Sequence, residues 1–227
     1  ILKIVLIGAL QIGIMYMLYL NAFNYTSVQK ILLFTITTPF YVTMISQIIN
    51  KKIKLFAFFI ALISILGALV IRMTDFNTGD FVGFIFIQLA NVSFASGQVL
   101  YKIIKADNKI STNVYTDFSF FFIGASFITL IGLMISTSSY TQPSSTSQWL
   151  LVLWLGGGAS GIGYYFWNHG ATQVRVETLA TMNNLVIPLG LFIEVLFFSG
   201  TYNYQTFVVG SVIIISSIIA SLRFDNN

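Results

Sequence analysis

The sequence predicts an all-α membrane protein, a polytopic helical bundle, from three observations. Of its 227 residues, 56% are hydrophobic and 8% are charged, whereas soluble proteins carry about 25% charged residues. The apolar residues form long continuous runs rather than the short alternating segments of a transmembrane barrel. The chain has no cysteine, which excludes a disulfide scaffold and thiolate metal sites. Soluble and intrinsically disordered classes are excluded on the same composition.

Eight stretches are long enough to cross a bilayer, which requires about 20 mostly apolar residues. Each ends where turn-forming and charged residues cluster. The first stretch follows Lys3 and resembles the apolar core of a signal peptide, but no small-residue cleavage site follows it, so we expect a span. The expected spans are 4–20, 31–50, 55–71, 81–101, 118–135, 149–168, 177–198 and 205–222.

The distribution of basic residues predicts the orientation of these spans. With eight crossings, both termini lie on the same side as the loops near residues 51, 105 and 172. That side holds nine of the eleven basic residues, and the other holds Lys30 and Arg72. The nine are Lys3, Lys51, Lys52, Lys54, Lys102, Lys105, Lys109, Arg175 and Arg223. Because basic loops stay in the cytoplasm, we expect a multi-pass protein of the inner (cytoplasmic) membrane with both termini cytoplasmic.

The chain contains a weak internal repeat. Sliding it on itself by 149 residues superposes the first three spans on the last three and aligns several identical residues. These pairs are Gly8 with Gly157, Tyr16 with Tyr165, Ala22 with Ala171, and Pro39 with Pro188. The copies run in opposite directions across the membrane, as in secondary transporters with inverted repeats.

The repeat predicts two units. Residues 80–227 form a complete unit of five helices, and residues 1–75 form a partial unit of three. We therefore expect about 70 further residues before Ile1, enough for two more spans. A natural eight-helix protein is the alternative.

Three segments resemble a known family. They are residues 161–171 (GIGYYFWNHGA) followed by Pro188, the pair Asn21-Ala22 followed by Pro39, and residues 83–105 with Asn91, Ala95 and Tyr101. Together they resemble an EamA-type permease of the drug/metabolite transporter superfamily, with this chain as helices three to ten of ten. The resemblance implies an inner-membrane secondary carrier for amino acids or other small metabolites, often an exporter. Family members often carry a glutamate beyond each proline, where this chain has Lys52 and Thr201.

The fourth expected span carries a polar stripe. Gln88, Asn91 and Gln98 fall within about 80° of one another at 100° per residue. Their amides could line a hydrophilic cavity, or they could form hydrogen bonds between helices. The sequence leaves both alternatives open.

The two spans that contain proline carry the other candidate site residues. Pro39 and Pro188 each remove a backbone donor, so we expect kinks near the membrane midplane, where inverted-repeat carriers bind their solutes. Asn183 and Asn184 are adjacent amides in mid-span, which are costly to bury without a purpose. Thr37 and Thr38 precede the first proline. The expected substrate-binding residues are Thr37, Thr38, Gln88, Asn91, Gln98, Asn183 and Asn184.

Glu194 is the acidic residue that lies furthest inside an expected span. It could exchange a proton during transport, or its side chain could reach the lipid headgroups and fix the depth of the helix. Glu177, near Arg175 at the start of the same span, has the simpler explanation of an interfacial ion pair.

We interpret the chain as a secondary transporter that moves small polar metabolites, such as amino acids or amines, by alternating access. No ATP-binding motif is present, and the single histidine, His169, excludes the usual metal clusters and catalytic triads. We therefore expect no enzyme activity, no metal and no cofactor. The expected partners are a small-molecule solute and the lipid bilayer, with no nucleic acid, and a homodimer is left open. The alternative function is a membrane-embedded binding or scaffold subunit that transports nothing.

Overall fold

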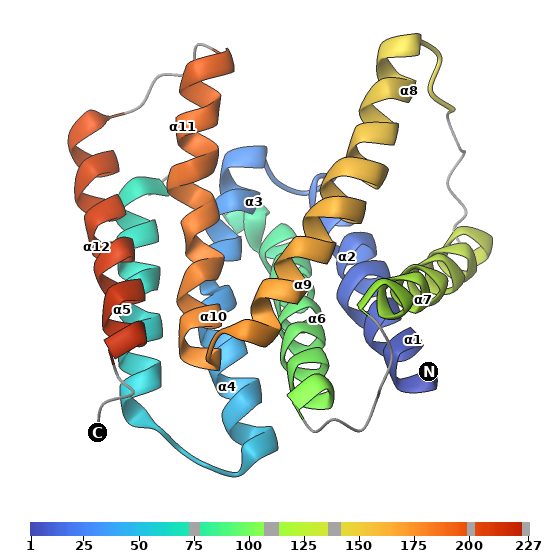
Figure 1. Ribbon diagram of the computed structural model, residues 1–227. Helices are drawn as coiled ribbons and strands as arrows, with labels where there is room; N and C mark the ends of the chain where they lie inside the picture. Colours follow the sequence, from blue (N-terminus) through green and yellow to red (C-terminus); the bar gives the residue numbers. More distant parts are fainter. Residues whose placement is uncertain (73–77, 107–113, 136–141, 199–202, 224–227) are drawn as a thin grey trace.

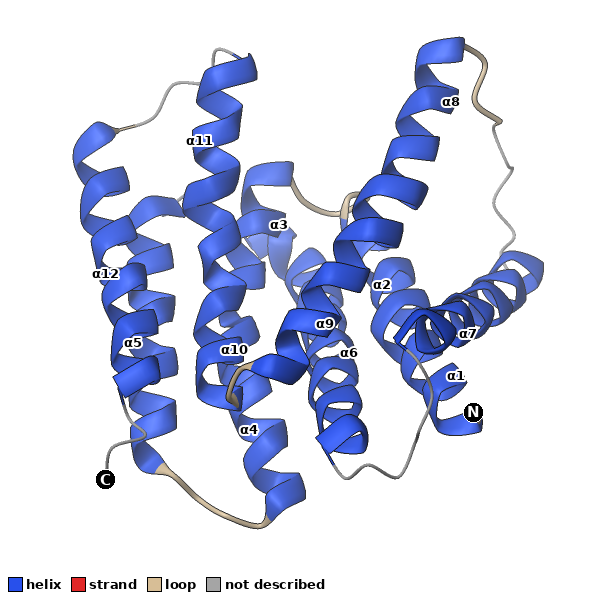
Figure 2. Ribbon diagram, in the orientation of Figure 1, coloured by secondary structure: helices blue, strands red, loops and turns tan. Residues whose placement is uncertain are grey.

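The computed structural model describes residues 1–72, 78–106, 114–135, 142–198 and 203–223. All regular secondary structure in these ranges is helical, and no strand occurs in them (Figure 2). Within the described ranges, six helices are long and apolar enough to cross a membrane. They are Leu2–Ala22, Val28–Asn50, Phe81–Ala106, Tyr115–Ile135, Val176–Phe197 and Tyr204–Arg223. The predicted polytopic helical membrane fold is confirmed.

Two of the eight expected spans differ from these six. The stretch 55–71 is helical as α5, Leu55–Arg72, but its apolar part, Leu55–Ile71, is shorter than the other spans. The stretch 149–168 lies in a helix made of α8 (Thr146–Leu153), a π-helical segment (Trp154–Gly163) and α9 (Tyr164–Gln173). Its glycines and polar residues lower its hydropathy below that of a clear span, so the number of crossings stays a prediction.

The long helix α6, Phe81–Ala106, occupies the centre of the bundle (Figure 1). It packs against α2 (Met15–Ala22), α4 (Thr38–Asn50) and α9. Small residues on α6 allow close approach: a Cβ added to Gly97 would lie 2.2 Å from the Cβ of Gln11. Close packing through small residues stabilises helix pairs in a bilayer, where burial of apolar surface gives little driving force.

Helix α7, Val114–Ile135, packs on α1, Leu2–Gly8, and on the π-helical turn that follows it. A Cβ at Gly8 would lie 2.2 Å from the carbonyl oxygen of Phe121, and one at Gly124 would lie 1.9 Å from that of Val5. The two backbones therefore meet at these glycines, which no other residue could replace without separating the helices.

Helices α5 and α12, Tyr204–Arg223, form a side-by-side pair at one edge of the bundle (Figure 1). Gly67 and Gly210 face each other across this contact, since a Cβ at either would approach the other's carbonyl oxygen. The start of α1 and the end of α12 lie at the same end of the bundle, as does the connection from α4 to α5 (Figure 1).

Helix irregularities recur at positions related by the 149-residue shift. A π-helical turn at Ala9–Ile14 joins α1 to α2, and the one at Trp154–Gly163 joins α8 to α9. The other two breaks are 3-10 turns. One, Thr35–Thr37, joins α3 (Val28–Phe34) to α4, and the other, Asn183–Leu185, joins α10 (Val176–Met182) to α11 (Val186–Phe198). Pro39 and Pro188 lie just beyond these 3-10 turns, so a tightened turn precedes each proline, and the expected kinks stay a prediction.

Candidate solute-binding site

A cavity of about 500 Å³ is lined by α6, by α9 and by the two helices that contain Pro39 and Pro188. Its volume falls in the range of about 300–1,000 Å³ typical of small-molecule sites. The wall combines aromatic and aliphatic side chains with a few amides and hydroxyls. The lining residues are Met15, Tyr16, Tyr19, Leu32, Thr35, Thr38, Ala90, Asn91, Phe94, Ala159, Gly163, Tyr164, Trp167, Asn183, Asn184 and Val186.

The 3-10 turn before Pro39 organises one wall of this cavity. Proline cannot donate a backbone hydrogen bond to the carbonyl of Thr35, and the hydroxyl of Thr38 donates to that oxygen instead at 2.6 Å. The neighbouring carbonyls accept from amides of other helices: Asn91 Nδ2 donates to Phe34 at 2.9 Å and Asn184 Nδ2 donates to Ile36 at 3.2 Å. The turn therefore holds both amides at the cavity wall.

Of the seven expected binding residues, four line the cavity: Thr38, Asn91, Asn183 and Asn184. The other three are held in contacts between helices. Thr37 Oγ1 and Tyr41 Oη both donate to Gln88 Oε1, at 2.7 and 3.0 Å. Gln98 is fully buried and donates from Nε2 to Asn183 Oδ1 at 3.2 Å. In the α6 stripe, Asn91 therefore lines the cavity, whereas Gln88 and Gln98 form hydrogen bonds between helices without reaching it.

The aromatic wall was not among the residues expected at the site. Tyr16, Tyr164 and Trp167 all line the cavity. Tyr16 shares a hydrogen bond of 2.9 Å with Ser160, and its ring centroid lies 6.2 Å from that of Tyr164. The indole N–H of Trp167 is buried and has no hydrogen-bond partner among the described residues. The available signal was aromatic residues three positions apart, at 16 and 19 and at 164 and 167, but the same spacing fits a packed core.

Glu194, the candidate for proton coupling, belongs to α11, and the structure does not describe its side chain. Glu177 is described: its carboxylate lies 3.0 Å from Lys54 Nζ and 3.5 Å from Arg175 Nε. The expected ion pair of Glu177 with Arg175 is present, and Lys54, just before α5, also contacts the carboxylate.

An apolar layer separates the cavity from a second, charged cavity. We define the apolar layer as Val42, Ala95, Val99, Ala171, Leu179 and Ala180, all buried. On α6, Phe94 lines the first cavity, Val99 belongs to the layer and Lys102 lines the second cavity. Helices α4 and α9 show the same order, as does α10 together with the 3-10 turn that follows it, so buried apolar side chains lie between the two cavities.

A bundle of apolar helices around a cavity of this size and mixed polarity defines a membrane transporter. The chain is 36% identical to the biotin transporter of Escherichia coli strain K12 over 214 residues, 94% of this chain and 71% of that protein. The same figures hold for the biotin transporter of Salmonella typhimurium strain LT2. The probable biotin transporter of Pseudomonas aeruginosa strain PAO1 is 36% identical over 216 residues, 95% of this chain and 75% of that protein. The chain therefore belongs to the biotin transporter family and is a multi-pass inner-membrane transporter, not an enzyme.

Two further comparisons concern the fold. A protein of known crystal structure superposes with a TM-score of 0.77 over 98% of this chain and 78% of its own, at 16% identity, which supports the fold alone. No protein-family model matches the chain. The prediction of an EamA-type permease is corrected by the biotin transporter relatives, which cover nearly the whole chain. That prediction depended on short motifs of small and apolar residues, which recur in closely packed membrane helices of many kinds.

Proposed function

We propose that this protein carries biotin across the inner membrane and binds it in the cavity between the proline-containing helices. The observation that carries the proposal is the composition of the cavity wall. Biotin has a ureido group with two N–H donors and a carbonyl acceptor, an apolar thioether ring and a chain that ends in a carboxylate. Amides offer donors and acceptors to the ureido group, and the aromatic wall offers an apolar surface to the ring system.

The proposed substrate replaces the amino acids and amines expected from the sequence. Those solutes are small and polar throughout, whereas much of the cavity wall consists of Met15, Phe94, Trp167 and tyrosines. A solute with an extended apolar part fills such a cavity better. The relatives named as biotin transporters favour the same substrate.

The proposal includes the finer architecture: eight crossings built from an inverted repeat, with units 1–75 and 80–227. The matching π-helical turns, and the 3-10 turns that precede both prolines, support it. Helices α6 and α7 have no counterpart at the 149-residue shift within this chain. Helix α7 packs on α1 of the first unit. The residues that correspond to α1 in the second unit lie in α8 and the π-helical segment after it, and their apolar side chains are exposed.

Orientation, energy coupling and assembly complete the proposal. The surplus of basic residues on one side supports an orientation with both termini in the cytoplasm. An ion gradient or the biotin gradient drives transport, with Glu194 as the candidate proton carrier, and a homodimer stays an open prediction. A scaffold subunit stays the alternative. The carrier is favoured because Asn91, Asn183 and Asn184 line the wall of a cavity in addition to bonding neighbouring helices.

Uptake of labelled biotin into proteoliposomes tests the proposal. Asn184, 1% exposed in the structure, bonds the carbonyl of Ile36 at the cavity wall. Asn184→Leu should reduce initial uptake at least about tenfold, since a site built for hydrogen bonds discriminates strongly when one is lost. The matched control is Asn21→Leu, because Asn21 is an exposed amide that bonds its own helix at the end of α2. Equal biotin uptake by both variants and the native protein would move the binding site elsewhere, and absence of uptake by the native protein would refute the function.

A further inference from the structure

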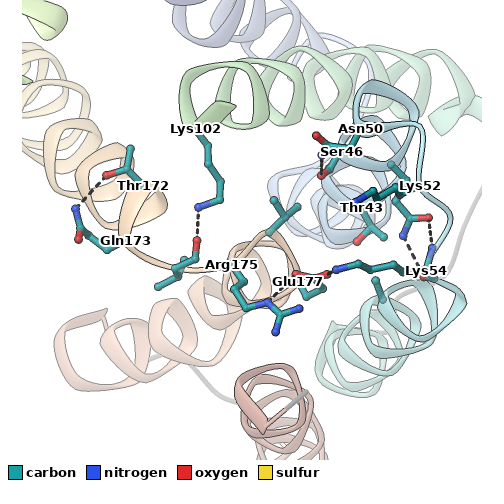
Figure 3. Close-up of a pocket in the computed structure, with 14 residues that line it drawn as sticks. Thr43, Ser46, Asn50, Lys52, Lys54, Lys102, Thr172, Gln173, Arg175 and Glu177 are labelled. Atoms are coloured by element: carbon teal, nitrogen blue, oxygen red, sulfur yellow. Dashed lines mark hydrogen bonds and ion pairs between the residues drawn. The ribbon is translucent and has the colours of Figure 1, made fainter. Parts of the chain in front are cut away.

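The second cavity, beyond the apolar layer, has a volume of about 760 Å³ and carries an excess of positive charge. We call it the cationic vestibule. Four basic side chains line it, against the single carboxylate of Glu177 (Figure 3). The basic residues are Lys52, Lys54, Lys102 and Arg175. Neutral polar residues, among them Thr43, Ser46, Asn50 and Thr172, complete the wall.

The one carboxylate of the cationic vestibule is already neutralised. Lys54 and Arg175 both contact Glu177, at 3.0 and 3.5 Å. The charges of Lys52 and Lys102 are therefore in excess. An excess of one sign of charge in a partly enclosed cavity of low-dielectric walls concentrates ions of the opposite sign.

Lys102 is held in place without a carboxylate partner among the described residues. Its ammonium group donates to the carbonyl of Ala171 at 3.0 Å and to the carbonyl of Val174. Both acceptors lie at the C-terminal end of α9, where the helix dipole favours a cation. Figure 3 shows the side chain directed from α6 toward this end of α9. The charge is thus positioned by neutral groups and stays available to an anion.

An independent observation indicates a ligand in the same cavity. Thr43 is 1% exposed, its hydroxyl has no hydrogen-bond partner within the described part of the chain, and it lines the cationic vestibule. A buried hydroxyl without a partner costs free energy that a bound acceptor would offset. A carboxylate oxygen is such an acceptor, and it also suits the excess positive charge.

We propose that the cationic vestibule is a second solute site, which binds the carboxylate of the transported molecule on the far side of the apolar layer from the first cavity. The inference rests on the proposed function for the identity of that carboxylate as biotin's. Lys102 is its main charged ligand, and Lys52 and Thr43 are further ligands. Along α6, Lys102 lies eleven residues beyond Asn91, about 16 Å at 1.5 Å per residue. A solute would therefore occupy the two sites in turn as the layer opens.

Equilibrium binding to the purified protein in detergent tests this proposal with biotin and its neutral carboxamide. Lys102→Gln should weaken one of the two biotin-binding steps about tenfold, leave the other unchanged, and change carboxamide binding by less than about twofold, as expected for loss of one charge-assisted hydrogen bond in the cationic vestibule. Lys102→Arg should keep most of the affinity for biotin. Lys51→Gln is the matched control, because Lys51 carries the same charge at the same end of the bundle but does not line the cationic vestibule. Equal effects of Lys102→Gln on biotin and on the carboxamide would overturn the proposal.

A second arm separates this proposal from the proposed function. Pentanoate, the acid chain of biotin alone, should raise the thermal stability of the native protein, and pentanamide should not. The shift should vanish in Lys102→Gln, or in Lys52→Gln if the first variant fails to fold. A pentanoate shift without any biotin binding would refute biotin as the substrate and keep the carboxylate site. Stabilisation by phosphatidylglycerol without stabilisation by pentanoate would assign these cations to lipid headgroups and overturn the site.

Discussion

Gln98 on α6 and Asn183 at the 3-10 turn after α10 form an amide pair at the floor of the candidate site. Gln98 Nε2 donates to Asn183 Oδ1 at 3.2 Å, and Asn183 Nδ2 lies 3.4 Å from Gln98 Oε1. Gln98 is fully buried, whereas Asn183 also lines the cavity. The pair links the central helix to the proline-containing helix at the boundary between the cavity and the apolar layer.

We expect this pair to couple in a double-mutant cycle. Gln98→Leu should lower the free energy of unfolding by about 1–3 kcal/mol, because it leaves part of the buried Asn183 amide unsatisfied. Gln98→Leu with Asn183→Leu should cost less than the sum of the single changes, by about 0.5–1.5 kcal/mol. Thermal or denaturant unfolding in detergent measures all four proteins. Additive effects would show that the two amides contribute independently.

The sequence predicted the helices better than the site. Long apolar runs determine helices in a bilayer, so the expected ranges 81–101 and 205–222 lie within α6 and α12. The amides Asn91 and Asn184 stood out because polar groups are rare in mid-span. Tyr164 and Trp167 did not stand out, because an aromatic residue on a cavity wall and one in a core have the same pattern.

The sequence also did not predict which polar side chains form hydrogen bonds with one another. Gln88, Asn91 and Gln98 of the α6 stripe all bond residues outside α6. Of the three, Asn91 also lines the cavity, whereas Gln88 and Gln98 do not. Which member of a stripe meets a partner depends on the rotation and crossing of helices, which small residues such as Gly97 determine locally. The family also required relatives, because short motifs did not distinguish one carrier family from another.

Gly8 and Gly157, which correspond in the repeat, should respond differently to the same substitution. A Cβ at Gly8 would lie 2.2 Å from the Phe121 carbonyl oxygen, whereas no described atom lies within 4 Å of a Cβ at Gly157. Gly8→Ala should therefore destabilise the protein by about 1–3 kcal/mol through separation of α1 and α7. Gly157→Ala should be neutral or slightly stabilising, since alanine favours the helix. Unfolding of both variants in detergent gives the comparison, and equal losses would contradict the close contact at Gly8.

Trp167→Phe should weaken biotin binding without loss of stability. The indole N–H of Trp167 is buried without a described partner on the wall of the cavity, so a bound solute is its natural acceptor. The affinity for biotin should fall about fivefold to tenfold, in line with one hydrogen bond of roughly 1–1.5 kcal/mol. Stability without biotin should be unchanged or higher, because the orphan donor is removed. Trp154→Phe is the control, since Trp154 is 68% exposed outside the cavity. Unchanged biotin affinity in Trp167→Phe would exclude the indole N–H from solute binding.

The proposed orientation can be tested directly, because these 227 residues contain no cysteine that would react alongside an introduced one. Ile53, 81% exposed between α4 and α5, lies at the end of the bundle that carries most basic residues, and Ser144 is exposed ahead of α8 at the opposite end. If basic loops are cytoplasmic, an impermeant maleimide applied to intact cells should label Ser144→Cys and spare Ile53→Cys. After the cells are permeabilised, Ile53→Cys should label as well, which shows that its thiol is reactive and was protected by the membrane. Labelling of Ile53→Cys in intact cells, with Ser144→Cys spared, would reverse the orientation. It would then place the cationic vestibule on the outer side, where it would receive biotin before the apolar layer opens rather than after.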